Sequence, residues 1–130
     1  MKVKDKMTRN VVTVRPDNSL KEALDLMKQR FINRLPVIDN GVLVGMIVKN
    51  DIEKALHRPG YYPETPVSWI MSQNIITVHP DDDLVSAAAI FKNRKISALP
   101  VLDGNNLVGI ITDTDVIKTF IEIMQTKSFN

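Results

Sequence analysis

A threonine and an aspartate stand three residues apart, directly after an apolar run. The run ends at Ile110 and Ile111, and the two polar residues are Thr112 and Asp115. A β-branched run that stops in this way predicts a strand followed by the start of a helix. A helix N-terminus offers unpaired backbone N–H groups and a partial positive charge, so it is a ready site for phosphate. The hydroxyl of Thr112 would add a neutral donor.

The carboxylate of Asp115 must serve another part of such a ligand, because it would repel phosphate. One carboxylate can accept hydrogen bonds from both vicinal hydroxyls of a ribose. The spacing therefore favours a turn that binds a nucleotide. A second interpretation is a capping box, since Thr-x-x-Asp is also typical of a helix start. Both interpretations can hold before a ligand arrives.

The chain is built from an internal repeat, and the elements of this repeat must position the turn of Thr112 and Asp115. Residues 7–17, MTRNVVTVRPD, match residues 71–81, MSQNIITVHPD, and the offset stays constant to the end of the repeat. It pairs Asp115 with Asp51 and Thr112 with Val48, so the first copy keeps the acid and lacks the hydroxyl. We predict two motifs, residues 1–57 and 67–130, joined by a Pro-rich linker at 58–66.

The sequence pattern of each motif predicts secondary-structure elements in the order β-α-β-β-α. In the first copy the expected elements are a strand at 11–14, a helix from Leu20 capped by Ser19 and Glu22, a hairpin turning at 39–41, and a helix at 51–56. In the second copy Asp83 replaces the cap, the hairpin turns at 103–106, and the last helix runs from 114 to about 124. The predicted fold is α/β (α+β), with the two motifs packed sheet to sheet to share a core.

Composition narrows the class of protein. The chain has 130 residues, is 44% hydrophobic and 25% charged, carries a net charge of +2 and contains no cysteine. Mixed charge signs without a basic stripe argue against nucleic acid, and the absence of a long apolar run argues against a membrane helix. With no signal-peptide pattern, we expect a cytoplasmic protein.

The sequence resembles a tandem pair of CBS (cystathionine-β-synthase) motifs, also called a Bateman module, of the stand-alone bacterial or archaeal type. The elements that carry the resemblance are Met-Thr/Ser-x-Asn, Leu-Pro-Val, Leu-Val-Gly and Thr-x-x-Asp, duplicated in register. The resemblance covers residues 3 to about 124. It implies regulation by an adenosine-containing ligand in the cleft between the two motifs, and a homodimer.

The resemblance also implies which residues bind. One site would combine residues of both motifs: Met7, Val12, Ile32, Asn33, Arg34, Ile110, Thr112 and Asp115. Arg34 stands where a basic phosphate contact is frequent. A second, weaker site would use Met46, Asp51, Met71, Ile76, Ile96 and Ser97. Because Val48 and Ala98 replace Thr112 and Arg34 there, it should bind on the order of 100-fold more weakly.

We therefore expect a non-catalytic sensor of AMP, ADP or ATP, with no cofactor and no metal. No nucleophile with a base and no cluster at metal-ligand spacing is found. The alternatives are a dimerisation or partner-binding scaffold with vestigial sites, a sensor of S-adenosylmethionine or a cyclic dinucleotide, and an acetoin-utilisation-type accessory protein. The last helix is more apolar than a lone surface helix needs, which favours a homodimer, and a regulated partner protein is possible.

Overall fold

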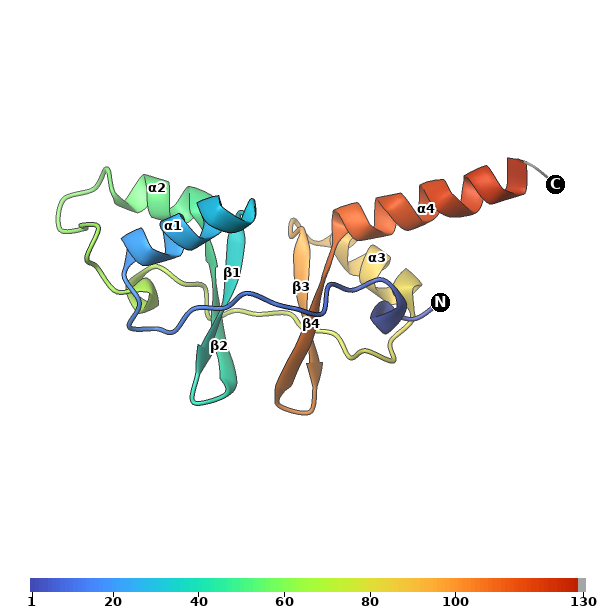
Figure 1. The fold of residues 1–130 in the computed structure, drawn as a ribbon, viewed down its shortest axis with the longest axis horizontal. Helices are drawn as coiled ribbons and strands as arrows, with labels where there is room; N and C mark the ends of the chain where they lie inside the picture. Colours follow the sequence, from blue (N-terminus) through green and yellow to red (C-terminus); the bar gives the residue numbers. More distant parts are fainter. Residues whose placement is uncertain (129–130) are drawn as a thin grey trace. The chain divides into compact units, whose positions relative to one another are not determined.

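The computed structural model describes residues 1–128; residues 129 and 130, the end of the second predicted motif, lie outside the described residues. The chain forms two compact units (Figure 1). We call Val12–Ile75 the middle unit, and Met1–Val11 together with Ile76–Asn130 the terminal unit. The α+β fold class is confirmed, because each unit contains one small antiparallel sheet and two α-helices.

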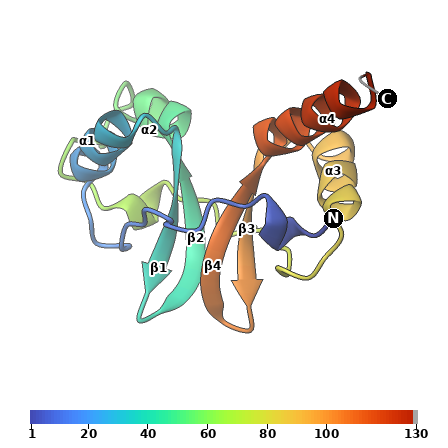
Figure 2. The same cartoon turned by 45° about the vertical axis from the view of Figure 1, so that its right-hand side comes forward.

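The middle unit has both helices on one face of its hairpin (Figure 2). Its elements are α1 (Leu20–Arg30), β1 (Arg34–Asp39), β2 (Val42–Val48), α2 (Lys49–Ala55) and the 3₁₀ helix η2 (Val67–Trp69). Strand β1 pairs antiparallel with β2, and the register places Arg34 opposite Val48. The predicted turn is confirmed: Asn40 and Gly41 both have positive φ, as a two-residue mirror-image turn requires.

The terminal unit repeats this plan. Its elements are the 3₁₀ helix η1 (Val3–Asp5), α3 (Leu84–Asn93), β3 (Ala98–Asp103), β4 (Asn106–Thr112) and α4 (Asp113–Ser128). The β3–β4 register places Ala98 opposite Thr112, which matches the Arg34–Val48 pair of the middle unit. The last helix begins one residue before the predicted start and ends four residues after the predicted end.

The compact units are not the two sequence repeats. The first eleven residues pack with the second repeat, where the backbones of Thr8 and Ile110 exchange two hydrogen bonds of 2.9 Å. The linker and its continuation pack with the first repeat, where Ser72 and Met46 form the equivalent pair. Each unit is therefore completed by the segment that precedes the other repeat in the chain.

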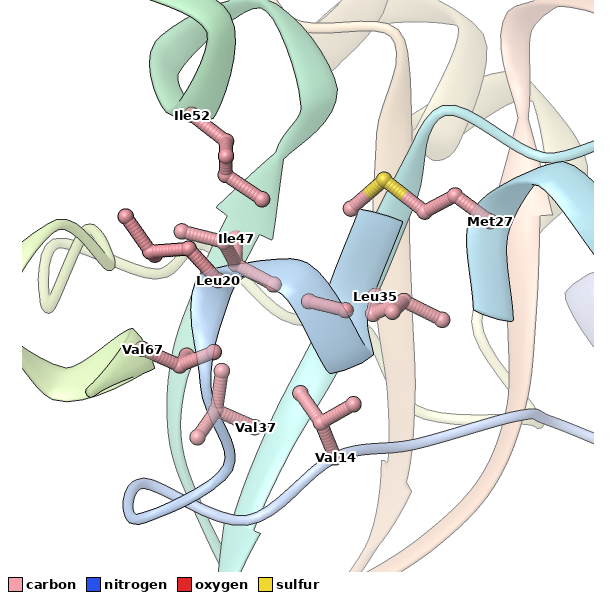
Figure 3. Packing of buried hydrophobic residues seen from close by; sticks show 9 residues of the cluster. Val14, Leu20, Met27, Leu35, Val37, Ile47, Ile52 and Val67 are labelled. Carbon is pink, nitrogen blue, oxygen red and sulfur yellow. The ribbon is translucent and has the colours of Figure 1, made fainter. Parts of the chain in front are cut away.

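Each unit buries its own core. In the middle unit, side chains from α1, β1, β2 and α2 point toward a common centre (Figure 3); they include Leu20, Met27, Leu35, Val37, Ile47 and Ile52. The terminal unit has an equivalent cluster built from Val3, Val78, Leu84, Ala87, Leu99, Val101 and Ile111. Two separate cores explain why the chain divides into two units rather than one.

The first expected strand of each motif is shorter than predicted. Residues 11–14 form no regular strand; Val14 makes a single parallel bridge to Val37, and Val78 makes the equivalent bridge to Val101. Val14 donates to the Pro36 carbonyl and accepts from Ile38. Pro16, two residues later, has no N–H with which to extend this ladder, so the β-branched run pairs at one residue only.

The first helix of each repeat, α1 or α3, begins with a different kind of N-cap. Ser19 accepts from the Glu22 N–H at 3.0 Å, and Glu22 accepts from the Ser19 N–H at 3.2 Å, which confirms the predicted capping box. Asp83 stands at the N-cap of α3, but within the described chain its side chain makes no capping hydrogen bond. The prediction that Asp83 replaces the serine as a cap is wrong: the carboxylate stays at the surface and the Ser86 N–H bonds the Asp83 backbone carbonyl instead.

Ser19→Ala should lower the free energy of unfolding by about 1 kcal/mol, because an N-cap hydrogen bond is lost. Asp83→Ala is the matched control and should change it by less, since no cap bond is broken. Urea unfolding of the three chains measures both values. Equal losses for the two variants would contradict this difference between the caps.

Acid should remove the contribution of the Glu22 carboxylate to the free energy of unfolding. The Ser19 N–H, then the Ser19 hydroxyl and the Asn18 amide, hold the pKa of Glu22 below its ordinary value of 4.5. A lowered folded-state pKa stabilises the fold above pH 4.5 and loses that effect as the pH falls through it. The urea midpoint of Glu22→Gln should lie below that of the wild type at pH 7, and the gap should close toward pH 3. A gap that widens in acid would contradict this assignment.

Candidate functional site

Thr112 and Asp115 lie at the junction of β4 and α4 and hold each other in place. The Asp115 N–H donates to Thr112 Oγ1 at 3.2 Å, and the Thr112 N–H donates to Asp115 Oδ2 at 2.9 Å. Both side chains are half-buried. The structure thus contains the capping box, one of the two interpretations of the spacing, and the box fixes the position of the carboxylate at the end of the strand.

The segment that carries Met7 lies against the same strand. The two Thr8–Ile110 hydrogen bonds attach it to β4. Gly109 leaves room for the Met7 side chain, because a Cβ at position 109 would lie 2.5 Å from Met7 Sδ. Four of the predicted residues, Met7, Ile110, Thr112 and Asp115, therefore come from adjoining segments of the terminal unit.

Two further contacts tie helix α4 to this arrangement. Lys6 Nζ lies 3.0 Å from Glu122 Oε2, which links the segment before Met7 to the middle of α4. Inside the helix, the buried Thr119 hydroxyl donates to the Asp115 carbonyl at 2.8 Å. No sequence pattern indicates Lys6, Thr8 or Thr119. The Met7–Gly109 contact does have a sequence signal, which is a glycine within a strand.

The other four predicted residues lie in the middle unit. Val12 and Ile32 pack against its core, and the Asn33 carbonyl accepts from the Lys49 N–H at 2.8 Å. Arg34 begins β1 and is half-buried. Within residues 1–128 it forms no ion pair or side-chain hydrogen bond, so its guanidinium keeps all its donors for another molecule.

The second predicted set divides between the units in the same way. Met46, Asp51 and Met71 belong to the middle unit, where Met71 lies on Gly45 as Met7 lies on Gly109. Ile76, Ile96 and Ser97 belong to the terminal unit, where the Ser97 carbonyl accepts from the Asp113 N–H.

The turn at Asp51 lacks the reciprocal bonds of its counterpart. Val48 occupies the N-cap of α2, and in the described part of the chain no side chain caps this helix. Asp51 is exposed, whereas Asp115 is half-buried. Val48 has no hydroxyl to accept the Asp51 N–H, and among residues 1–128 the Asp51 carboxylate accepts no hydrogen bond that would hold it in place.

Residues 1–128 contain neither a cluster of metal-ligating side chains nor a helix that could span a membrane. No three histidine, aspartate or glutamate side chains of this part of the chain come close enough together to hold a metal ion. None of its helices is long and apolar enough to span a bilayer.

Comparison with known families identifies the repeat. A family model described as "CBS domain" matches residues 3–58 and again residues 67–122. The chain belongs to the CBS domain family. Both CBS domains contain their Asp near the matched end, Asp51 in the first and Asp115 in the second, and the matched ranges leave out residues 59–66.

Curated relatives of this CBS pair differ in length. The CBS domain-containing protein YhcV of Bacillus subtilis is 40% identical over 114 residues, which cover 88% of this chain and 81% of YhcV. Other relatives are longer, and this chain covers 45% or less of three of them, among them a homoserine O-acetyltransferase of Methanococcoides burtonii. The CBS pair is thus found both in small proteins and within larger ones.

Solved structures have the same fold over nearly the whole chain. A protein assigned to acetoin utilization (AcuB) from Vibrio cholerae has a TM-score of 0.89 at 31% identity, covering 100% of this chain and 97% of that one. The CBS domain pair of MJ0100 in complex with 5′-methylthioadenosine and S-adenosyl-L-methionine has a TM-score of 0.83 at 34% identity, covering 92% and 95%. CBSX2 in complex with AMP has a TM-score of 0.81 at 29% identity, covering 95% and 98%.

Proposed function

We propose that this CBS pair is a non-catalytic sensor of an adenosine-containing ligand, and that Thr112 and Asp115 bind the nucleoside. The observation that carries the proposal is the fixed turn at the start of α4. Thr112 and Asp115 are held there by their reciprocal hydrogen bonds, beside Met7 and Ile110.

The capping box is compatible with ligand binding. A carboxylate has about four acceptor positions, and among residues 1–128 the Asp115 carboxylate accepts one hydrogen bond, from the Thr112 N–H. Its remaining positions can accept the two hydroxyls of a ribose. Because the box already orders the side chain, binding would cost little of its conformational freedom.

The ligands of the relatives narrow the chemical class. MJ0100 was solved with 5′-methylthioadenosine and S-adenosyl-L-methionine, and CBSX2 with AMP. All three molecules contain adenosine and differ in what the 5′ carbon carries. We propose that this chain takes AMP, ADP or ATP, because Arg34 supplies a cation with no carboxylate partner within residues 1–128. The resemblance assigns Val12, Ile32, Asn33 and Arg34 to the same ligand as Asp115.

Arg34→Ala tests the choice between these ligands. Loss of a charged hydrogen bond should weaken AMP binding by roughly tenfold to 100-fold. Binding of 5′-methylthioadenosine, which has no phosphate, should stay unchanged. Isothermal titration of both ligands gives the two ratios, with the exposed Arg30→Ala as the control variant. Equal loss for both ligands would contradict a phosphate contact.

A thermal-shift screen tests the proposed function as a whole. Any ligand that binds only the folded chain raises its melting temperature as its concentration rises. AMP, ADP, ATP, S-adenosylmethionine and a cyclic dinucleotide are the probes, and inosine monophosphate is the control for the base. We expect stabilisation by the adenine nucleotides. No shift with any adenosine compound at millimolar concentration would refute the sensor and leave the scaffold as the function.

A scaffold that associates through its own surface is the second candidate, favoured by the exposed apolar residues of α4. Ile117, Phe120 and Ile121 are exposed along this helix. A homodimer is the form of association that the resemblance implies. The two candidates are compatible, because a sensor needs a surface through which ligand binding changes an assembly.

A further inference from the structure

Helix α1 is followed by a phenylalanine in a backbone conformation that glycine usually adopts. Phe31 has φ 56° and ψ 42°, which is the left-handed region, and it is 95% exposed. Its N–H and the N–H of Ile32 both donate to the Met27 carbonyl, a helix end whose left-handed position is most often glycine. A bulky side chain is strained in this region, and the Phe31 ring gains little from contacts within its own chain.

The equivalent helix of the second repeat ends without this strain. Helix α3 stops one residue earlier in the repeat, and Arg94 after it has φ −123° and ψ 144°, an extended conformation. The repeat offset places Lys95 at the position of Phe31. The fold therefore requires neither a left-handed residue nor an aromatic ring at this point. A strained, exposed residue that the fold does not need indicates a contact with another molecule.

The chain around Phe31 is basic. Residues 26–38 contain three cations and no acid. Two of them, Lys28 and Arg30, lie in the last turn of α1 and are exposed. The third is Arg34, which the proposed function assigns to the nucleotide. Uncompensated positive charges next to an exposed ring favour an anionic partner.

Helix α2 adds a further cation to the same place. Lys49, exposed at the start of α2, donates its N–H to the Asn33 carbonyl at 2.8 Å, two residues after Phe31. In the chain up to residue 128, the side chains of Lys28, Arg30 and Lys49 form no ion pair and no hydrogen bond. Three positive charges near the exposed ring are thus available to a partner.

We propose that Phe31 and these three cations form a docking surface for an acidic segment of a partner protein, which places an apolar side chain on the Phe31 ring. Complementary charge favours the correct partner and raises the association rate, and an aromatic ring is a frequent anchor of an interface. Single-stranded nucleic acid is also anionic, but it is usually bound by several aromatic side chains on which successive bases stack. Residues 26–38 contain no other aromatic residue. The proposal goes beyond the nucleotide site and does not depend on it.

Random peptides displayed on phage, selected on the full-length chain and counter-selected on Phe31→Gly, test the nature of the partner. The enriched peptides should combine several aspartates or glutamates with a large apolar residue. Absence of enrichment, or enrichment of peptides without acidic residues, would overturn the proposal. A single-stranded oligonucleotide of mixed sequence is the second probe. If it bound the wild type and not Phe31→Gly, the surface would belong to nucleic acid and the proposal would be overturned.

The affinity of an enriched peptide, measured by fluorescence anisotropy, tests the cations. Lys28→Glu should weaken peptide binding about tenfold, because it replaces attraction by repulsion. Lys92→Glu is the matched control, since Lys92 is the exposed counterpart of Lys28 in the last turn of α3, and it should leave the affinity unchanged. Wild-type affinity of Lys28→Glu, or an equal loss in Lys92→Glu, would overturn the proposal.

The stability of Phe31→Gly tests whether the phenylalanine serves a partner or its own fold. The urea midpoint of this variant should lie above that of the wild type, because glycine adopts the left-handed conformation without strain. A lower midpoint would show that Phe31 serves the fold. Sedimentation equilibrium of both chains examines a second copy as the occupant, and we expect no difference between them. Self-association of the wild type that Phe31→Gly abolishes would, like the lower midpoint, overturn the proposal.

Discussion

Asp115→Ala is expected to weaken binding of AMP or ATP by on the order of 100-fold, because two hydrogen bonds to a charged acceptor are lost. The carboxylate stands at the start of α4, ordered by the Thr112 N–H, with most of its acceptor positions open. Isothermal titration of the variant measures the change. The matched control is Asp51→Ala, which removes the equivalent carboxylate from a turn that has no hydroxyl and no side-chain cap in the described chain.

The two roles of Asp115 can be separated. Asp115→Asn keeps an oxygen that can accept the Thr112 N–H, so the start of α4 should stay capped and the melting temperature should change little. The amide accepts hydroxyls less well than a charged carboxylate, so affinity should still fall by about tenfold. If Asp51→Ala reduced affinity as much as Asp115→Ala, or if Asp115→Asn bound like the wild type, the assignment of the sugar to Asp115 would be wrong.

Gly109→Ala is expected to lower the free energy of unfolding by about 1–3 kcal/mol, the usual cost of overpacking. The new Cβ would lie 2.5 Å from Met7 Sδ and 2.9 Å from the Thr8 carbonyl oxygen. The methionine is flexible, but the Thr8 carbonyl belongs to a backbone that Ile110 holds by two hydrogen bonds. The segment of Met7 must therefore move away from β4, and affinity for the adenosine ligand should fall together with stability.

Gly45→Ala provides the control for this second prediction. Its Cβ would lie 2.7 Å from Met71 Sδ and 3.0 Å from the Ser72 carbonyl oxygen, so it should cost similar stability in the middle unit. It should affect the Asp115 site less, because Met71 belongs to the weaker predicted set. Adding Met7→Ala to Gly109→Ala should restore part of the stability. Full stability of Gly109→Ala in urea unfolding would show that the Met7 segment does not need this close approach.

The repeat made much of the fold predictable. Because one spacing pattern recurs in register, the hairpin at Asn40 and Gly41 predicted its partner at Gly104, and each helix had a counterpart. The capping boxes of Ser19 and Thr112 could also be predicted, since both depend on residues three apart. In both boxes the paired residues, Ser19 with Glu22 and Thr112 with Asp115, are three positions apart, so their spacing is visible in the sequence.

The features of the fold that could not be predicted depend on contacts between segments far apart in the chain, and the spacing of residues within one segment does not reveal such contacts. The run at 11–14 is rich in β-branched residues, yet in the described part of the chain it pairs only at Val14, because Pro16 has no N–H with which to extend the ladder along β1. Asp83 is a competent cap by type, but its side chain stays in solvent. A glycine within a strand signals a close approach at Gly109, but only the structure shows that Met7 is the residue that approaches it and so lies beside the turn of Thr112 and Asp115.

Backbone amide NMR during a titration with AMP is the most direct test of whether the turn of Thr112 and Asp115 binds the nucleotide. We predict that the amide signals of Thr112, Asp115 and Thr8 shift first, with a single affinity, and that those of Val48 and Asp51 shift only at much higher concentration. A spectrum that stays unchanged at saturating AMP, or one in which Asp51 and Asp115 respond at the same concentration, would contradict it.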